Sequence, residues 1–301
     1  MILKPHKACD AELDKLNSVM WIMPKLDGVR ALHFNGKFQS RTLKPFPNVN
    51  LMAFDYHLLE GLDGELVKGS PLSGFSCRDT TSGTSTINGP AASEFTWYIF
   101  DCISAKEPGA PYSVRYELAR QKVEMLRPAS GLNLEVIPYQ IAYCVEDVMR
   151  IHAEYVAQGY EGSILRRPTG LYKPGRATVR EGDFLRLKDF IEEEAVILEL
   201  IEGETNNNVA TINALGYTER SSHKANKVGN GMVGSLRCKD LKTDQEIMVA
   251  AGCLTHDERK KLFDSQELAV GQVIKYRAMP YGKKNLPRFP TFQCFRAPFD
   301  M

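Results

Sequence analysis

The sequence lacks an apolar run long enough to cross a bilayer. The longest apolar stretch, AVILELI at residues 195–201, is far shorter than the roughly 20 residues that a membrane-spanning helix needs. Nor does the N-terminus have the pattern of a signal peptide, because Lys4, His6, Lys7 and Asp10 interrupt every apolar stretch there. These absences argue against a membrane protein or a secreted one, and we expect a cytoplasmic protein.

Cysteine is sparse and scattered. The chain of 301 residues has seven cysteines, and no two of them stand at the spacing of metal ligands. An odd number without a secretory context argues against a disulfide framework. We therefore expect reduced thiols that mostly fill the core.

Net charge is nearly absent, at +1, but the charges are unevenly distributed. Residues 165–190 carry seven basic side chains against three acidic ones, and residues 217–242 carry six against two. Basic stretches of this kind suit a phosphate backbone. Each could equally be a solvated face, so charge alone leaves nucleic-acid binding open.

Residues 1–189 show the pattern of an α+β domain built around antiparallel sheet. The segment 29–41 predicts a β-hairpin, because Asn35-Gly36 is the dipeptide that a type I′ turn favours. Apolar residues recur at helical spacing in three segments, and Gly159 would cap the last of them. The expected helices are 50–60, 113–126 and 145–158. The expected strands are 64–67, 95–101, 134–138, 162–166 and 184–188.

Residues 190–301 predict a second domain, in which short strands dominate. Its one expected helix, 255–265, begins with the capping box of Thr255 and Glu258. About five short strands and one helix indicate a small β-barrel, of which the OB-fold is common in nucleic-acid enzymes. The expected strands are 194–201, 232–238, 246–250 and 272–278.

Lys25 opens the segment KLDGVR, which stands just before the predicted hairpin. A lysine that acts as a nucleophile must lose its proton near neutral pH, and neighbouring cations favour that loss by like-charge repulsion. The pattern KxDG alone is a weak signal, and an ordinary surface lysine would fit it.

The order of the motifs that follow Lys25 is more informative. They are SRT at 40–42, DGE at 63–65, WYIFD at 97–101, EGSILRR at 161–167, FLRLKDF at 184–190 and PRFPTFQCFR at 287–296. Together they resemble the covalent nucleotidyltransferase superfamily of DNA ligases, RNA ligases and mRNA capping enzymes. Within it the chain resembles the small viral ATP-dependent DNA ligases nearly from end to end, including DTTS at 79–82 and GYTERSSHK at 216–224.

The resemblance implies an ATP site in the first domain, with Lys25 as the residue that carries AMP. Arg30 and Glu65 would hold the ribose, and Phe100 would stack on adenine. Phe100 could also be one more apolar residue of an alternating strand. The remaining nucleoside contacts that we expect are Pro24 and Thr86.

The resemblance also implies how the phosphates are held. Glu161, with Glu65, would bind Mg²⁺ or Mn²⁺ through carboxylate oxygens. Arg186 and Lys188 alternate with leucines, so both point the same way toward the α-phosphate. The family usually has lysine at the first of these positions, and a guanidinium can grip phosphate but does not readily donate a proton. In the second domain the residues expected to orient pyrophosphate are Arg288 and Arg296, although exposed arginines beside an edge strand would fit as well.

Contacts to nicked duplex DNA are expected in both domains. In the first domain the implied phosphate ligands are Ser40, Arg41, Lys173 and Arg176, for which a solvated surface is the alternative. In the second, the polar segment 203–231 is too long for an ordinary loop. The segment resembles a latch hairpin that closes around DNA, and we expect the segment to be poorly ordered until DNA binds. Its basic residues are Arg220, Lys224 and Lys227.

The sequence thus predicts an ATP-dependent DNA ligase that seals a 3′-hydroxyl to a 5′-phosphate through lysyl-AMP and AMP–DNA intermediates. Such an enzyme serves DNA replication, repair and recombination. We expect a monomer and see no sign of a partner protein. An RNA ligase that uses ATP and a capping enzyme that uses GTP are the alternatives, and neither accounts for the likeness at 216–224.

Overall fold

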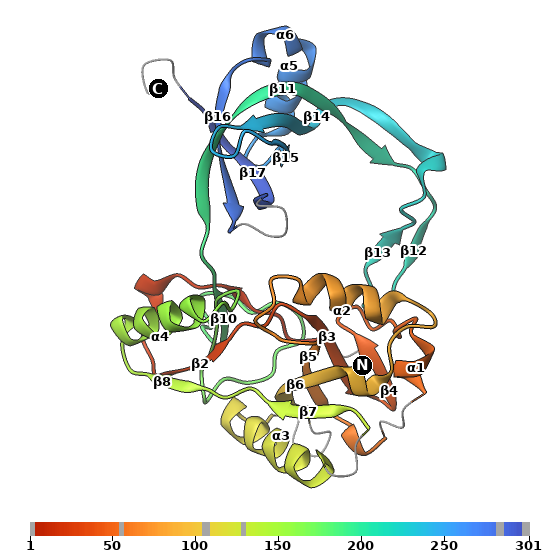
Figure 1. The fold of residues 1–301 in the computed structure, drawn as a ribbon, viewed down its shortest axis with the longest axis vertical. Helices are drawn as coiled ribbons and strands as arrows, with labels where there is room; N and C mark the ends of the chain where they lie inside the picture. The colour runs from red at the N-terminus through yellow and green to blue at the C-terminus, as the bar shows by residue number, and fades with distance from the viewer. Residues whose placement is uncertain (1–3, 54–56, 104–108, 128–130, 281–285, 297–301) are drawn as a thin grey trace. The chain divides into compact units, whose positions relative to one another are not determined.

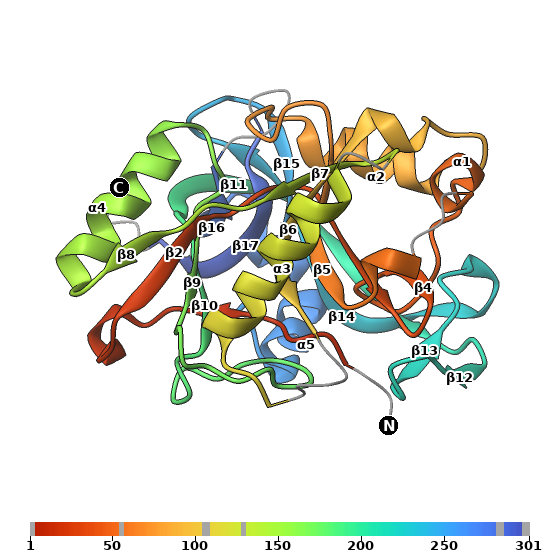
Figure 2. The same ribbon diagram turned by 90° about the horizontal axis from the view of Figure 1, so that it is seen from below.

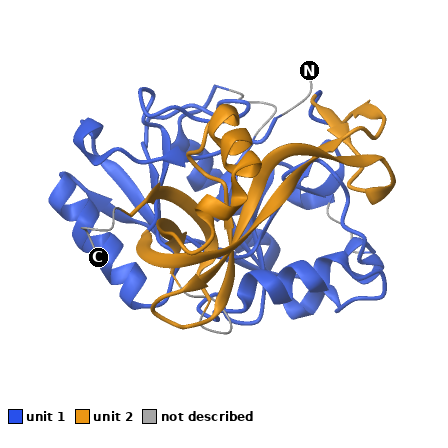
Figure 3. Cartoon of the chain, turned by 90° about the horizontal axis from the view of Figure 1, so that it is seen from above, with its two compact units in different colours: residues 1–188, 214–216 blue, residues 189–213, 217–301 orange. Residues whose placement is uncertain are grey.

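The computed structural model describes residues 4–53, 57–103, 109–127, 131–280 and 286–296. The chain divides into two units (Figure 3). Unit 1 comprises residues 1–188 and 214–216, and unit 2 comprises residues 189–213 and 217–301.

The first sheet of unit 1 has five strands in the order β1-β10-β9-β2-β8. β1 runs parallel to β10, and the other neighbours are antiparallel. Apolar side chains of β2 and β9, such as Ile22 and Leu165, are fully buried in the core that they share with helix α4 (Val145–Ala157). The strands are β1 (Cys9–Asp10), β10 (Phe184–Leu187), β9 (Ser163–Arg166), β2 (Met20–Pro24) and β8 (Gln140–Ala142).

The second sheet of unit 1 also has five strands, in the order β4-β3-β5-β6-β7. Only β6 and β7 run parallel to each other. The strands are β4 (Lys37–Ser40), β3 (Val29–Phe34), β5 (Leu62–Lys68), β6 (Phe95–Cys102) and β7 (Asn133–Val136).

Side chains along β6 alternate between the two faces of the sheet, so one set enters the core and the other set is only half-buried. Phe95, Trp97 and Ile99 are fully buried, whereas Phe100 belongs to the half-buried opposite phase. Helix α3 (Tyr112–Leu126) lies along β6 and β7 and adds Ala119 and Val123 to this core (Figure 2). The shorter helices of this unit are α1 (Val49–Met52) and α2 (Ser76–Ser85).

Unit 2 is a closed five-stranded barrel in the order β11-β14-β15-β17-β16. Its core includes Ile197, Leu236 and Tyr276, and the Tyr276 hydroxyl donates a hydrogen bond to the buried Asp240 carboxylate. The strands are β11 (Ile191–Asn206), β14 (Lys227–Asp240), β15 (Glu246–Ala250), β17 (Arg288–Phe295) and β16 (Val273–Met279). The helices are α5 (His256–Asp264) and α6 (Gln266–Ala269).

Two of the barrel strands extend into a long hairpin (Figure 1). β11 and β14 remain paired as far as Asn206 and Lys227. Between them, β12 (Ala210–Ile212) and β13 (Thr218–Arg220) pair with each other and form the head of the hairpin. The hairpin expected at 203–231 is therefore present.

Most of the expected elements are confirmed. Asn35 and Gly36 both have positive φ between β3 and β4, as a type I′ turn requires. The expected second-domain barrel is closed, and its helix α5 has the Thr255–Glu258 capping box. The expected helix 50–60 is not continuous: α1 ends at Met52, and residues 54–56 lie outside the described residues.

The sequence does not predict helix α2, because serine, threonine and glycine dominate this helix and give no clear apolar stripe. Within the part of the chain that the structure describes, no helix is both long and apolar enough to cross a membrane.

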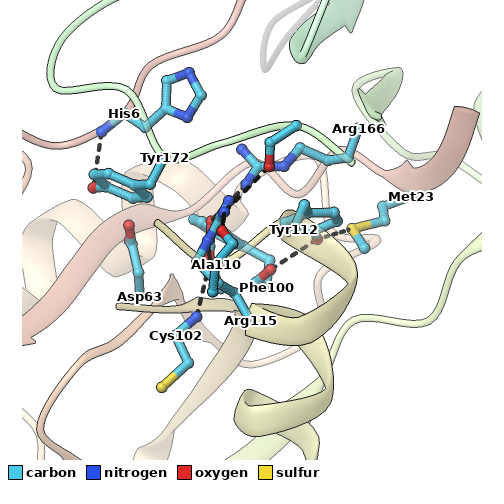
Figure 4. Close-up of polar contacts among 12 residues, drawn as sticks. His6, Met23, Asp63, Phe100, Cys102, Ala110, Tyr112, Arg115, Arg166 and Tyr172 are labelled. Carbon is cyan, nitrogen blue, oxygen red and sulfur yellow. Dashed lines mark hydrogen bonds and ion pairs between the residues drawn. The ribbon is translucent and has the colours of Figure 1, made fainter. Parts of the chain in front are cut away.

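Asp101, on β6, is buried, and its carboxylate is shared by two buried arginines, Arg115 and Arg166, which are labelled in Figure 4. Arg115 of α3 donates from Nε to Oδ1 at 2.8 Å, and Arg166 of β9 donates from Nη2 to Oδ2. Burial would raise the pKa of Asp101, but the two guanidiniums outweigh it and hold that pKa below its usual range. Because β6 and β9 belong to different sheets, this ion cluster joins the two sheets of unit 1.

Replacing Asp101 with alanine leaves two guanidiniums without their buried counter-ion. We expect Asp101→Ala to lower the free energy of unfolding by about 3–5 kcal/mol, measured by urea denaturation. Glu117→Ala is the control, since it breaks an exposed ion pair with Arg120 on the same helix and should change little. Equal effects of the two substitutions would contradict a structural role for the cluster.

Candidate active site

A cavity of about 480 Å³ in unit 1 is lined by residues of both sheets. One sheet contributes Pro24 and Arg186, and the other contributes Arg30, Glu65 and Phe100. The cavity therefore lies where motifs far apart in the sequence meet.

Lys25 and Lys188 meet at the carboxylate of Glu161. The Nζ of Lys25 contacts Oε2 of Glu161, and the Nζ of Lys188 contacts Oε1. The side chain of Glu161 is only 9% exposed, so these contacts are shielded from water. One carboxylate thus holds two ammonium groups at the cavity.

The backbone explains why these three residues converge. Lys25 follows β2, Glu161 precedes β9 and Lys188 follows β10, and the three strands are neighbours in one sheet. The amide of Lys25 donates to the Gly162 carbonyl at 2.9 Å, and the amide of Glu161 donates to the Lys25 carbonyl at 3.2 Å.

Gly162 is required for this convergence. Its φ is +146°, and a Cβ at this position would lie 2.3 Å from the carbonyl oxygen of Leu187. Any larger residue would push β10 away and would displace Lys188 from Glu161. Steric crowding by Leu187 therefore explains why the residue after Glu161 is glycine.

The charges of the cluster influence one another. Burial would raise the pKa of Glu161, but Lys25 and Lys188 outweigh it and the pKa is lowered. Burial and the ammonium of Lys25 lower the pKa of Lys188, despite its contact with Glu161. Glu161 therefore remains ionised, and the lysines repel each other across it.

Arg30 is held rigidly on the wall opposite the lysines. Its Nε donates to Oδ1 of the buried Asp63 at 2.9 Å, and its Nη1 donates to the carbonyl of His6. Its guanidinium also lies 5.3 Å from the centre of the Phe100 ring. The structure thus brings two expected nucleoside contacts, Arg30 and Phe100, side by side.

Glu65 lies opposite Arg30 in the β3–β5 ladder and also lines the cavity. Burial raises its pKa to about 7, and the nearby carboxylates of Glu161 and Asp63 add to that shift. A cation in the cavity would favour the ionised form of Glu65.

Glu65 and Glu161 are compatible with a magnesium ion. Mg²⁺ is commonly bound by one or two carboxylates, with water and substrate phosphates completing its shell. Among the described residues no group of three or more acidic, histidine or cysteine side chains could hold a metal by itself. The carboxylates present therefore suit an ion that arrives with a phosphate ligand.

Further polar residues surround the cavity. Arg186 lines it but pairs with Asp10, with Nε 2.6 Å from Oδ1. Ser40, Arg41 and Arg176 line it as well. A phosphate that binds Arg186 must therefore compete with the carboxylate of Asp10.

Several expected residues lie elsewhere. Thr86 is exposed at the end of α2, where its hydroxyl donates to the Ser82 carbonyl, and it does not line this cavity. It lines a separate hollow with Lys68 and Pro90, so the structure does not bring it to the other nucleoside contacts. Lys173 is also outside the cavity lining and pairs with Glu181 at 2.6 Å.

The expected residues of unit 2 are distributed between the barrel and the hairpin. Arg288 and Arg296 flank β17, and Arg296 pairs with Glu194 at 2.6 Å. Lys227 lies 3.6 Å from Glu204 in the hairpin. Arg220 donates to the carbonyl of Asn208, and Lys224 begins a short 3-10 turn.

The structure adds cavity residues for which the sequence suggested no role. They come from the N-terminal segment, from α3 and from the far ends of β9 and β10. Arg166 lies between the rings of Tyr112 and Phe184, with Cζ at 3.9 and 4.1 Å from their centres. The added lining residues of these kinds are Lys7, Tyr112, Arg166 and Phe184.

Two family models match this chain. Residues 1–188 match the family model of the ATP dependent DNA ligase domain, and residues 226–296 match that of the DNA ligase OB-like domain. The DNA ligase of African swine fever virus (strain Badajoz 1971 Vero-adapted) is 23% identical over 121 residues, which is 40% of this chain. The chain spans 28% of the length of that relative.

Solved structures show a similar fold. Chlorella virus DNA ligase-adenylate is 23% identical with a TM-score of 0.56, and the match covers 99% of both chains. A structure from an analysis of Lig E DNA ligases is 18% identical with a TM-score of 0.73, covering 98% of this chain and 100% of the other. Since the ligase domain model alone spans more than half of the sequence, the chain belongs to the family of ATP-dependent DNA ligases.

Proposed function

We propose that this protein seals nicks in duplex DNA with ATP, and that Lys25 carries the AMP. The observation that carries the proposal is that Lys25 and Lys188, which both line the cavity, converge on the carboxylate of Glu161 in a chain that belongs to the ligase family. A lysine beside a second ammonium group, at a cavity that can hold a nucleotide, is an arrangement suited to a lysine nucleophile.

In the first step, the neutral amine of Lys25 attacks the α-phosphorus of ATP. An N–P bond forms, and the bond from that phosphorus to the bridging oxygen breaks, so that pyrophosphate leaves. Glu161 contacts Nζ of Lys25 and is placed to accept its proton. Lys188 and Arg186 would stabilise the charge that develops on the α-phosphate.

Glu65 and Glu161 would hold the magnesium ion, which would neutralise phosphate charge when it is bound. Arg30, fixed by Asp63, and Glu65 would hold the ribose, and Phe100 would stack on the adenine. Pro24 would line the same site.

In the second step, a 5′-phosphate oxygen at the nick attacks the phosphorus of the lysyl-AMP. The P–N bond breaks and AMP passes to the DNA. In the third step, the adjacent 3′-hydroxyl attacks the activated 5′-phosphate, a phosphodiester forms and AMP leaves. Ser40, Arg41 and Arg176 at the cavity, with Lys173, would hold the DNA phosphates.

Unit 2 would serve two stages of this sequence. Arg288 and Arg296 would orient the pyrophosphate during the first step. The hairpin with Arg220, Lys224 and Lys227 would contact the duplex during the later steps, because guanidinium and ammonium groups bind backbone phosphates.

An RNA ligase or a GTP-using capping enzyme would share the lysine chemistry. Labelling with radioactive ATP or GTP distinguishes a capping enzyme from a ligase. Sealing of nicks in all-DNA or RNA-containing duplexes distinguishes an RNA ligase from a DNA ligase. We further propose that the protein acts inside cells as a monomer. Sealing only of RNA strands, or labelling only by GTP, would overturn the assignment.

Removing the nucleophile should abolish the first step alone. We expect Lys25→Ala to form no lysyl-AMP, yet to seal a nick that was adenylylated chemically in advance, because the third step needs no lysine nucleophile. Lys37→Ala, at an exposed position of β4, is the control and should be labelled normally. Label that persists in Lys25→Ala would place the nucleophile elsewhere.

Arg288→Ala should separate the first step from the last. Because Arg288 is proposed to orient pyrophosphate, we expect a loss of self-adenylylation at least about tenfold greater than the loss in sealing pre-adenylylated nicks, as expected for one charged contact. The two rates are measured in single-turnover assays. Equal losses would instead assign Arg288 to DNA binding or to barrel stability.

The hairpin can be shortened without disturbing the barrel, because Asn206 and Lys227 are paired neighbours in the β11–β14 ladder. We expect a variant that joins these residues by an Asn-Gly turn, without residues 207–226, to form lysyl-AMP normally. Its binding and sealing of nicked DNA should be weaker, and the deficit in binding should shrink at high salt. Normal sealing at ordinary salt would exclude a role for the hairpin in binding DNA.

A further inference from the structure

The head of the hairpin has a polar core of its own. Its exposed apolar residues Val209, Ile212 and Tyr217 contribute little packing, since between 49% and 81% of each is accessible. Asn208 is instead buried, at 7% exposure. Of the apolar residues in this segment Leu215 is buried, at 4% exposure, so hydrogen bonds and this one side chain together must order the segment.

The side chain of Asn208 joins both halves of the head. Its Nδ2 donates to Oδ1 of Asn206 at 2.8 Å, to the Ser221 carbonyl at 3.1 Å and to the His223 carbonyl at 2.8 Å. Its Oδ1 accepts from Nδ2 of Asn226 at 3.3 Å. The side-chain amide of Asn208 thereby binds two backbone carbonyls that follow β13. It also binds the side chains of Asn206, which ends β11, and Asn226, which immediately precedes β14.

Asn208 also positions the basic residues of the head. Its backbone carbonyl accepts from Nη1 of Arg220, so the guanidinium is anchored at one nitrogen and retains others for a ligand. The His223 carbonyl that Asn208 binds immediately precedes the 3-10 turn Lys224–Asn226. Arg220 and Lys224, the arginine and the lysine of the head, are thus both tied to this one asparagine.

Backbone hydrogen bonds complete the unit. The amide of Asn207 donates to the Asn226 carbonyl at 2.8 Å, and the amide of Asn213 donates to the Tyr217 carbonyl at 2.9 Å. β12 and β13 pair between these two points. All of these contacts lie within the hairpin, so none of them depends on DNA.

We propose that the head of the hairpin, residues 207–226, is folded before DNA binds, and that Asn208 is the positioning residue that presents Arg220 and Lys224 to the phosphodiester backbone of the duplex. The proposal rests on the proposed function, in which the hairpin contacts nicked DNA. It replaces the expectation of a segment that orders only on DNA with a head that arrives preformed, at a lower entropic cost of binding.

Three adjacent asparagines provide a matched comparison. Asn208→Ala removes the network, whereas Asn207→Ala removes an exposed side chain one residue away and keeps the backbone. We expect Asn208→Ala to weaken binding of a nicked duplex by about tenfold or more at low salt, and Asn207→Ala by less than about twofold. Formation of lysyl-AMP and the thermal midpoint of the barrel should be unchanged in both.

A double-mutant cycle tests whether Asn208 acts through the two cations. In an Arg220→Ala/Lys224→Ala background, Asn208→Ala should cost little further binding, because the groups that it positions are gone. The salt dependence of binding should also fall in Asn208→Ala by about as much as in that double variant. A full additional loss in this background would overturn the positioning role.

Hydrogen exchange of the DNA-free protein tests the preformed head directly. The amides of Asn207 and Asn213 should be protected in the wild type, and protection should be lost in Asn208→Ala but kept in Asn207→Ala. Unprotected wild-type amides would overturn the proposal. If instead removal of residues 207–226 leaves DNA binding intact, it is the role of the hairpin in the proposed function that fails.

Discussion

The carboxylate of Glu161 lies between the ammonium groups of Lys25 and Lys188, and the proposed chemistry depends on this contact. Three neighbouring strands of one sheet deliver these residues, and Gly162 allows the backbones to approach closely enough. Two ammonium groups so close together would repel each other strongly without the shared carboxylate. A ligand phosphate or a metal ion can redistribute these partners, which is what a site that first binds ATP and later releases AMP requires.

Internal carboxylates pair with three of the cations proposed to contact ATP. Asp10 holds Arg186, Asp63 holds Arg30, and in unit 2 Glu194 holds Arg296. The Arg30 pair is buried and keeps the guanidinium in place, whereas the other two pairs are more exposed and cost less to break. This difference fits the proposal in which Arg30 is a rigid nucleoside contact and Arg186 and Arg296 are phosphate contacts that can exchange partners.

The sequence carried enough information to predict the folds of both domains, and its ordered motifs indicated that Lys25, Glu161 and Lys188 serve one site. That their side chains form a single ion cluster was not predicted. Thr86 shows the limit of that reasoning, since a residue at the end of a helix without an apolar stripe could not be placed relative to the sheet. Arg166 shows another limit: the arginine lies within the EGSILRR motif, but its stacking between Tyr112 and Phe184 depends on packing of three separate elements. The polar core around Asn208 was likewise invisible in a segment rich in asparagine and glycine, which is typical of loops.

The most direct test of the central claim follows one AMP from protein to DNA. The protein is labelled with ATP that is radioactive at the α-phosphate, freed of nucleotide, and mixed with nicked duplex and magnesium but no ATP. The account predicts that the label leaves Lys25, appears transiently on the 5′ end of the nick and is released as AMP, with no more than one nick sealed per labelled protein. Label that stays on the protein, or sealing that requires fresh ATP in the first turnover, would contradict it.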